Sequence, residues 1–266
     1  MIDRGRKNIL GIMVNAVDYE ATEERVLRAA RNREALTVAA LSVHSVMTGA
    51  LEPEHRYRLN RIDLAVPDGQ PVRWALNALH GARLHDRVYG PNLMLRVCAR
   101  AAEEGLPVYF YGSRAEVLEA LARRLLHRFP RLRIAGMQDP PFRRLSPSER
   151  ARDVATILRS GAAITFVGLG SPKQEVWCYE HRDILSMPLL AVGAAFDFHA
   201  GVVRQAPPVL QRAGLEWAFR LAMEPRRLWR RYAYLNPLYV GLIAAQAAGI
   251  RFETGGVKPA EEQGSG

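Results

Sequence analysis

The alternation of short apolar runs with longer helical segments most constrains what this chain can fold into. Helical periodicity is clearest at residues 114–129, where Val117, Leu121 and Leu125 lie four residues apart on one face. Units of about 30 residues that repeat strand and helix imply right-handed crossovers between parallel strands. We therefore expect an α/β fold with a mostly parallel sheet flanked by helices. The runs that read as its buried strands cover residues 37–41, 62–66, 107–111, 132–136, 163–167 and 188–192.

The strand pattern stops near residue 212, and the rest of the chain reads as helices. Segments 214–224 and 226–233 are separated by Pro225, and Pro237 would interrupt or kink the weakly polar run that continues to residue 250. The last residues are polar and rich in glycine, as disordered tails are. We therefore expect three parts: an α/β domain at 1–212, a basic helical appendage at 213–252 and a disordered tail at 253–266.

The formal charge of +10, from 37 basic and 27 acidic side chains, suggests a polyanionic partner. Nucleic acid, an anionic membrane surface and a phosphate-bearing substrate all fit, and composition does not choose among them. No run of eighteen apolar residues predicts a membrane span, and the N-terminus lacks the apolar core of a signal peptide. The two cysteines cannot form a disulfide framework, so we expect a cytoplasmic protein.

The clearest local site follows the predicted strand at 163–167. Gly168 and Gly170 form a turn that lets backbone N–H groups approach a ligand, and the helix start beyond it favours an anion. A plain strand-to-helix turn explains these residues about as well, with Gln174 completing a capping box begun by Ser171. The spacing is neither the dinucleotide-binding G-x-G-x-x-G pattern nor a Walker loop. The capping pattern also occurs at Ser113 with Glu116 and at Ser146 with Glu149.

Acidic residues follow two other predicted strands. Asp68 lies where the 62–66 strand meets the next helix, and an acid there is either a general base or, more often, a helix N-cap. Asp197 and His199 follow the 188–192 strand and could bind a sugar hydroxyl or stabilise their own loop. The sequence has neither a D-x-D nor an H-x-x-x-H pattern, so we expect no metal site.

The appendage combines arginines with an apolar stripe. Residues 204–231 hold seven arginines against two glutamates, which is half of the formal charge excess. On a helix, Leu228, Tyr232, Leu235 and Tyr239 would share one face beside these arginines. Such a helix suits an anionic bilayer surface. An amphipathic helix packed on its own domain is the more common explanation of the same pattern.

Four motifs occur together and in one order. They are Pro67-Asp68-Gly69, the segment 168–175 (GLGSPKQE), the segment 192–197 (VGAAFD) with Gly201, and Leu215-Glu216-Trp217 followed by Arg220 and Glu224-Pro225-Arg226-Arg227. With these motifs the chain resembles the WecG/TagA/CpsF glycosyltransferases from about residue 35 to residue 235. The resemblance implies a Rossmann-like core and an inverting transfer of sugar from a UDP-sugar onto a polyprenyl-diphosphate-linked saccharide, in cell-surface polysaccharide synthesis at the cytoplasmic membrane face.

The resemblance also implies roles for single residues. Asp68 matches the general base proposed for the family, and Gln174 lies in its PKQE motif at the donor pocket. Arg87 matches the arginine of the family's E-R-V-x-G motif. The resemblance implies no cofactor and leaves open whether the protein forms a homo-oligomer. The implied donor site is Gly168, Gly170, Ser171, Gln174, Glu175, Asp197 and Arg87, and the implied acceptor or diphosphate site is Arg220, Arg227 and Arg230.

The chain departs from the family at one motif, and two other classes of protein remain as alternatives. Many members have T-L-N where this chain has Ala40-Leu41-Ser42, so the sequence does not identify the sugars, and Ser42 or His44 could substitute. The charge permits a non-catalytic nucleic-acid-binding module, although no zinc-finger, helix-turn-helix or RNP-like pattern is present. A Rossmann-type nucleotide-sugar oxidoreductase or epimerase would need the missing G-x-G-x-x-G.

Overall fold

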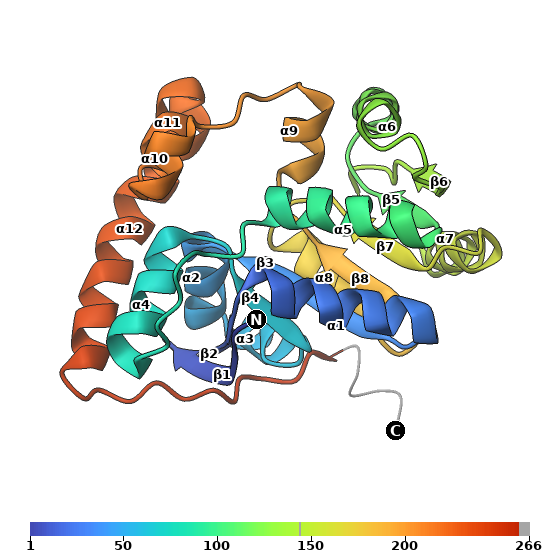
Figure 1. The fold of residues 1–266 in the computed structure, drawn as a ribbon. Coiled ribbons are helices and arrows are strands. Elements are labelled where there is room, and N and C mark those ends of the chain that lie inside the picture. The colour runs from blue at the N-terminus through green and yellow to red at the C-terminus, as the bar shows by residue number, and fades with distance from the viewer. Residues whose placement is uncertain (144, 261–266) are drawn as a thin grey trace.

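The computed structural model describes residues 1–143 and 145–260. Its centre is a parallel six-stranded sheet with the strand order β4-β3-β8-β7-β5-β6 (Figure 1). Every run predicted as a buried strand lies in this sheet, which confirms the expected α/β fold. The strands are β3 (Leu36–Leu41), β4 (Leu64–Pro67), β5 (Val108–Tyr111), β6 (Ile134–Gln138), β7 (Ile164–Val167) and β8 (Pro188–Ala191).

Alternate side chains of each strand enter two different cores. Val38 and Ala40 of β3 face one core, whereas Ala39 and Leu41 face the other. Because helices cover both faces, the strands are apolar throughout. The first face is covered by α1 (Tyr19–Asn32), α5 (Gly90–Glu104), α6 (Ala115–Arg128) and α9 (Ala195–Ala200). The second is covered by α2 (Val43–Leu51), α3 (Pro53–Leu59), α4 (Gln70–His80), α7 (Pro147–Arg159) and α8 (Lys173–His181).

Helix starts follow the capping patterns only in part. Ser146 caps α7 in a complete capping box with Glu149, as predicted. Helix α6 begins after Arg114 without a side-chain cap, so the box predicted for Ser113 and Glu116 is wrong. Ser113 has a φ of 66°, whereas an N-cap needs extended backbone, and this conformation removes it from the capping position.

An N-terminal β-hairpin was not among the predicted elements. Strands β1 (Asp3–Ile9) and β2 (Ile12–Val17) pair antiparallel through a turn at Leu10 and Gly11, which both have positive φ. Asn15 Oδ1 accepts a hydrogen bond from Ala65 N at 2.9 Å, so the hairpin lies against β4. The first residues of β1 are exposed and polar, and therefore give no apolar pattern.

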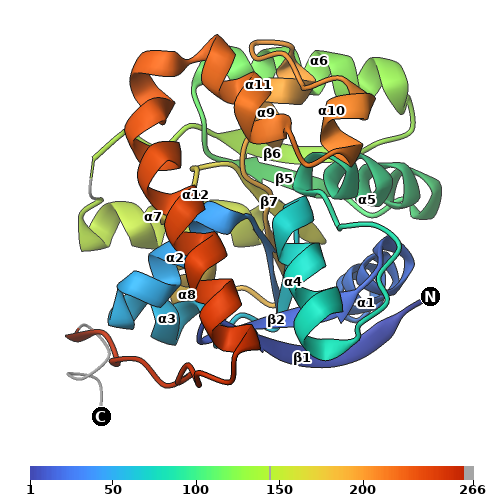
Figure 2. The same cartoon turned by 90° about the vertical axis from the view of Figure 1, so that its left-hand side faces the viewer.

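The appendage packs along the α/β domain as α11 (Glu216–Met223) and α12 (Pro225–Ala247), and the short helix α10 (Pro208–Arg212) leads into it (Figure 2). Helix α12 runs through Pro237, so the predicted interruption is wrong. Packing on both sides of Pro237 supports the helix: Leu235 packs against the second core, and the buried Tyr239 donates to Pro71 O at 3.1 Å. The apolar stripe therefore faces α2 and α4 of the same protein.

Residues 249–260, here called the C-terminal strap, run back across the N-terminal hairpin and α3. Phe252 O accepts from Asn8 Nδ2 at 2.7 Å, and Thr254 O accepts from Asn60 Nδ2 at 2.5 Å. Val257 N donates to a carbonyl at the start of α3 at 3.0 Å. The tail predicted at 253–266 thus begins inside the strap, and its residues 261–266 lie outside the described part of the chain.

Candidate functional site

Loops from four strands meet at the carboxyl edge of the sheet. Helix α2 leaves β3 toward one face, whereas α9 leaves the neighbouring β8 toward the other. Open α/β sheets bind ligands at such a point, where adjacent connections diverge. Backbone hydrogen bonds join the loops: Asp68 N donates to Leu41 O at 3.1 Å, and Gly168 N donates to Tyr111 O at 2.9 Å. The predicted site residues of the α/β domain, apart from Arg87, lie in these loops or in the first turn of the helices that follow.

Asp68 is not the N-cap of α4. Gly69 occupies that position, without a side-chain hydrogen bond. Asp68 Oδ1 instead accepts from Gly90 N, at the first residue of α5, at 2.6 Å. Burial raises the pKa of Asp68 to about 6, against the opposing effects of Arg87 and the Gly90 N–H. Such a group is ionised at neutral pH and binds a proton more readily than an ordinary carboxylate, as a general base must.

Glycine at position 90 allows α5 to approach Asp68 closely. A Cβ there would lie 2.9 Å from Val192 O and 3.1 Å from the Ala40 Cβ. Both distances are shorter than ordinary side-chain contacts, so a larger residue would push α5 away from the carboxylate. The glycine therefore sets the position of the N–H group that holds Asp68.

Arg87 lies near Asp68 and is paired with the appendage. Its Nη2 is 2.7 Å from Glu216 Oε2, and both side chains are largely buried. The guanidinium lies 4.1 Å over the ring of Tyr89, whose hydroxyl donates to Glu216 Oε1 at 2.5 Å. Sequence reasoning used Glu216 only as part of a motif and gave it no role. The signal that could have pointed to Glu216 was the presence of an acid beside Trp217 in that motif.

The turn after β7 is built by tertiary contacts. Helix α8 begins at Lys173 without a side-chain cap, so the capping box predicted for Ser171 and Gln174 is wrong. Gln174 is buried, and its Oε1 accepts from Gly193 N at 3.1 Å, because its side chain spans the loops after β7 and β8. At Gly168 a Cβ would lie 2.5 Å from the Phe196 ring. These contacts fix the backbone of the expected donor loop.

Glu175 is fully buried beneath this loop. Its Oε1 accepts from Ser45 Oγ at 3.5 Å, and Ser45 Oγ lies 3.3 Å from Ser171 Oγ. Its Oε2 has no hydrogen-bond partner. Burial raises the pKa of Glu175 to about 7. Glu175 therefore lies under the loop with a hydroxyl group on either side, rather than at its exposed surface.

Asp197 and His199 point to different parts of the molecule. Burial raises the pKa of Asp197, while the charges of Arg114, Arg227 and Arg220 lower it, so Asp197 faces arginines of the loop after β5 and of the appendage. A ring nitrogen of His199 lies 2.8 Å from Pro91 O, which ties α9 to α5. Asp197 and His199, which were predicted as one site, therefore have different partners and do not form a common site.

The appendage arginines have different surroundings. The charge of Arg220 lowers the pKa of both Asp68 and Asp197. Its Cζ lies 5.9 Å from the centre of the Phe198 ring. The charge of Arg227 also lowers the pKa of Asp197, and Arg227 Nη2 lies 2.8 Å from Glu224 Oε2. Arg230 is exposed and lies beside the ring of Trp229. Arg220 and Arg227 are thus near the acids of the edge, whereas Arg230 is on the outer surface.

Several buried polar atoms at this edge and in the appendage have no hydrogen-bond partner. Buried polar groups are normally paired, so an unpaired atom at this edge has a free position for a ligand atom or a water molecule. Sequence reasoning did not single out Gln70 or Arg231, and it named His44 only as a substitute in the altered motif. The atoms are Gln70 Oε1, His44 Nδ1 and Glu175 Oε2, which follow β4, β3 and β7, and the Nε atoms of Arg220 and Arg231.

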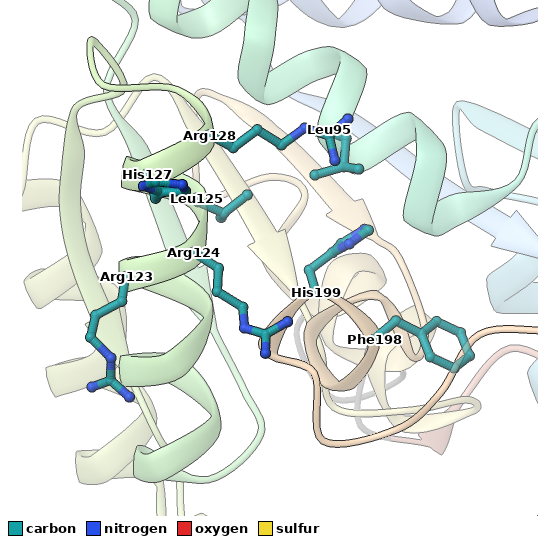
Figure 3. Close-up of a pocket in the computed structure, with 8 residues that line it drawn as sticks. All are labelled: Leu95, Arg123, Arg124, Leu125, His127, Arg128, Phe198 and His199. Carbon is teal, nitrogen blue, oxygen red and sulfur yellow. The ribbon is translucent and has the colours of Figure 1, made fainter.

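A cavity of about 500 Å³ lies on the flank of the molecule between α5, α6 and α9 (Figure 3). Figure 3 shows Arg124 and Arg128 of α6 reaching toward it. The predicted donor and acceptor residues do not line it, so it is separate from the carboxyl edge. Its lining consists of Leu95, Arg123, Arg124, Leu125, His127, Arg128, Phe198 and His199.

Two properties of the described residues concern metal ions and the membrane. Within residues 1–143 and 145–260, no three His, Cys, Asp or Glu side chains are grouped so that they could hold a metal ion. In the same residues, no helix is both long and apolar enough to cross a membrane.

Residues 7–252 match the family described as "Glycosyl transferase WecG/TagA/CpsF family". The protein is therefore a glycosyltransferase of cell-surface polysaccharide synthesis. The chain belongs to the WecG/TagA/CpsF family, as its motifs predicted, and the match also includes most of the N-terminal hairpin and all of α12. The family implies a nucleotide-sugar donor and a lipid-linked acceptor in general. The nucleic-acid-binding and oxidoreductase alternatives gain no support.

Proposed function

We propose that the protein transfers a sugar from a UDP-sugar to a polyprenyl-diphosphate-linked saccharide, with inversion at the anomeric carbon and Asp68 as general base. The observation that carries this proposal is the Asp68 carboxylate, which is half-buried at the carboxyl edge and held by Gly90 N at 2.6 Å. An attacking hydroxyl must lose its proton as it bonds to the anomeric carbon. A carboxylate with a pKa of about 6 accepts that proton at neutral pH.

The leaving group requires the opposite chemistry. As the bond from the anomeric carbon to the diphosphate oxygen breaks, negative charge grows on the diphosphate. Arg220 and Arg227 supply fixed positive charge at the edge, and the turn from Gly168 to Ser171 supplies backbone N–H groups. Attack from one face and departure from the other give inversion. We propose that these groups stabilise the diphosphate without a metal ion.

Asp68→Asn tests the base. The amide keeps an oxygen for Gly90 N and cannot accept the proton, so we expect kcat to fall about a hundredfold to ten-thousandfold, with UDP binding unchanged. Asp63→Asn is the matched control, because Asp63 also accepts a backbone N–H bond, from Thr37 N at 2.8 Å, at the opposite edge of the sheet. The assay combines a panel of UDP-sugars with a short-chain lipid-diphosphate sugar. Near-normal turnover of Asp68→Asn would refute the assignment.

We further propose that the outer face of the appendage binds an anionic membrane. The predicted stripe cannot do so, because Leu228 and Tyr239 are buried against the protein. The outer face instead exposes Trp217, Met223, Trp229, Tyr234 and Val240 among the exposed arginines Arg212, Arg226, Arg227 and Arg230. Each arginine near an anionic surface contributes about 1 kcal/mol, and exposed aromatic side chains insert at the interface.

A truncation after Arg212 tests this surface. The shortened protein should no longer float with vesicles that contain phosphatidylglycerol, whereas the full chain should. Vesicles of phosphatidylcholine alone are the control for charge. Single changes at Arg220 or Arg227 should reduce transfer more than flotation, because one charge contributes little to docking and much to a leaving diphosphate. Undiminished flotation of the truncated protein would refute the membrane role of the appendage.

A further inference from the structure

Glu216 joins the appendage to the loop that precedes α5. It is the first residue of α11, and its side chain is 14% exposed. Its two oxygens bind two side chains of the α/β domain: Oε2 lies 2.7 Å from Arg87 Nη2, and Oε1 accepts from the Tyr89 hydroxyl at 2.5 Å. Over the described residues, Glu216 is the only acid that forms an ion pair with the Arg87 guanidinium. The docked position of α11 therefore decides where this guanidinium points.

Neighbouring amides complete the same arrangement. Gln211 Oε1, in α10, accepts from Arg87 Nη2 at 3.4 Å, and Gln205 Nε2 donates to the Tyr89 hydroxyl at 3.4 Å. Both amides belong to the segment that leads into α11. The appendage side thus offers Arg87 one charged and one neutral acceptor.

Arg87 lies between two acids and is paired with only one of them. Val88 N donates to Pro67 O at 2.8 Å, so the backbone beside Arg87 is joined to the backbone beside Asp68. Burial lowers the pKa of Arg87, and the charges of Asp68 and Glu216 raise it. The guanidinium forms its ion pair with Glu216, and Asp68 is left with the Gly90 N–H as its hydrogen-bond donor. A buried cation that loses its partner takes the nearest remaining anion, because an unpaired buried charge is strongly destabilising.

We propose that Glu216 is a positioning residue that holds the Arg87 guanidinium away from Asp68. This inference rests on the proposed role of Asp68 as general base. With Glu216 in place, one Asp68 oxygen binds Gly90 N and the other is available to the acceptor hydroxyl. Without Glu216, Arg87 turns to Asp68 and the new ion pair occupies the base. Docking of α11 thereby converts Asp68 from a paired carboxylate into a free one.

The groups that surround Asp68 fix the sign of the expected effect. The charged and titratable side chains facing it are Arg87, Glu216, Arg220, Tyr19 and Tyr89. Arg87 and Arg220 lower the pKa of Asp68, whereas Glu216 raises it. Loss of Glu216 removes a negative neighbour and frees a positive one, and both changes lower the pKa of Asp68.

The test is an NMR titration of the full-length protein with ¹³C-labelled aspartate carboxyls, in which Asp68→Asn identifies the Asp68 resonance. The pKa of Asp68 should be about 6 in the unaltered protein. In Glu216→Ala it should fall by about one unit or more, the usual effect of a new ion pair with arginine. In Glu216→Ala combined with Arg87→Gln it should return toward the original value, because the competing cation is gone.

Glu23→Gln is the matched control. Glu23 is 6% exposed and pairs with Arg96 between α1 and α5, and neither residue is among the groups that shift the pKa of Asp68, so this variant should leave the titration of Asp68 unchanged. An unchanged pKa in Glu216→Ala would overturn the inference. So would a lowered pKa that Arg87→Gln fails to restore, because it would indicate that undocking of α11 simply exposes Asp68 to water. The titration does not depend on turnover, so its failure is distinct from the failure of Asp68→Asn to lose activity.

Discussion

Asp68→Asn should make the folded protein more stable at neutral pH while it removes activity. Folding raises the pKa of the carboxyl from 3.8 to about 6, so the ionised form is penalised in the native state. A group of this kind contributes stability that is fully present below pH 3.8 and lost as the pH rises through 6. Asparagine carries no charge and keeps an oxygen for Gly90 N, and it therefore avoids the penalty.

The size of the gain follows from that difference in pKa. One pKa unit corresponds to about 1.4 kcal/mol, so the variant should gain up to about 3 kcal/mol at pH 8 and nothing below about pH 4. Urea unfolding at pH 4, 6 and 8 measures both values, because the midpoint shifts in proportion to the free energy of unfolding when the slope is constant. Asp63→Asn, at the opposite edge, should give no gain at any of these pH values.

Two results would refute this reasoning. The first is a stability difference between Asp68→Asn and the unaltered protein that does not grow from pH 4 to pH 8. The second is an Asp68→Asn protein that is less stable at pH 8, which would mean that the ionised carboxylate is stabilised by its surroundings. Either result would remove the physical basis for a raised pKa at the proposed base.

Three more outcomes are expected. Gly90→Ala should lose about 1–3 kcal/mol of stability and most transfer activity, because its Cβ would lie 2.9 Å from Val192 O. Gly241→Ala, in open space on α12, should keep its stability and its activity. Equal unfolding midpoints for the two variants would contradict the close approach at Gly90. Truncation after Gly249 should lower Tm, because the backbone bonds of the strap are each worth about 1 kcal/mol, yet leave UDP binding intact by calorimetry. Transfer should persist in EDTA, and a loss restored by Mg²⁺ or Mn²⁺ would contradict the metal-independent proposal.

The sheet could be predicted from the sequence because its signal is local. Most strands are short apolar runs, because burial on both faces leaves few polar positions in them, although the edge strand β6 is only partly buried. The hairpin lacked that signal, since the exposed half of β1 is charged. Continuation of α12 through Pro237 depends on packing of Leu235 and Tyr239 against other helices, which a local pattern cannot contain.

The candidate site could be predicted only as a set of residue types. Motif resemblance identified Asp68, Arg87 and Gln174, and these residues lie at or beside one edge of the sheet. What each side chain does there depends on partners distant in sequence. Gln174 has the spacing of a capping residue, yet it binds Gly193 N, because the loop after β8 lies beside it. The partner of Arg87 lies in the appendage and could not be found from local spacing.

The separation of Glu216 from Tyr89 by 127 positions has a consequence for how the enzyme is made. The ribosome completes every strand of the sheet before it reaches α11, so the sheet can form before α11 covers its carboxyl edge. Synthesis of the fold and assembly of the site are therefore separate events.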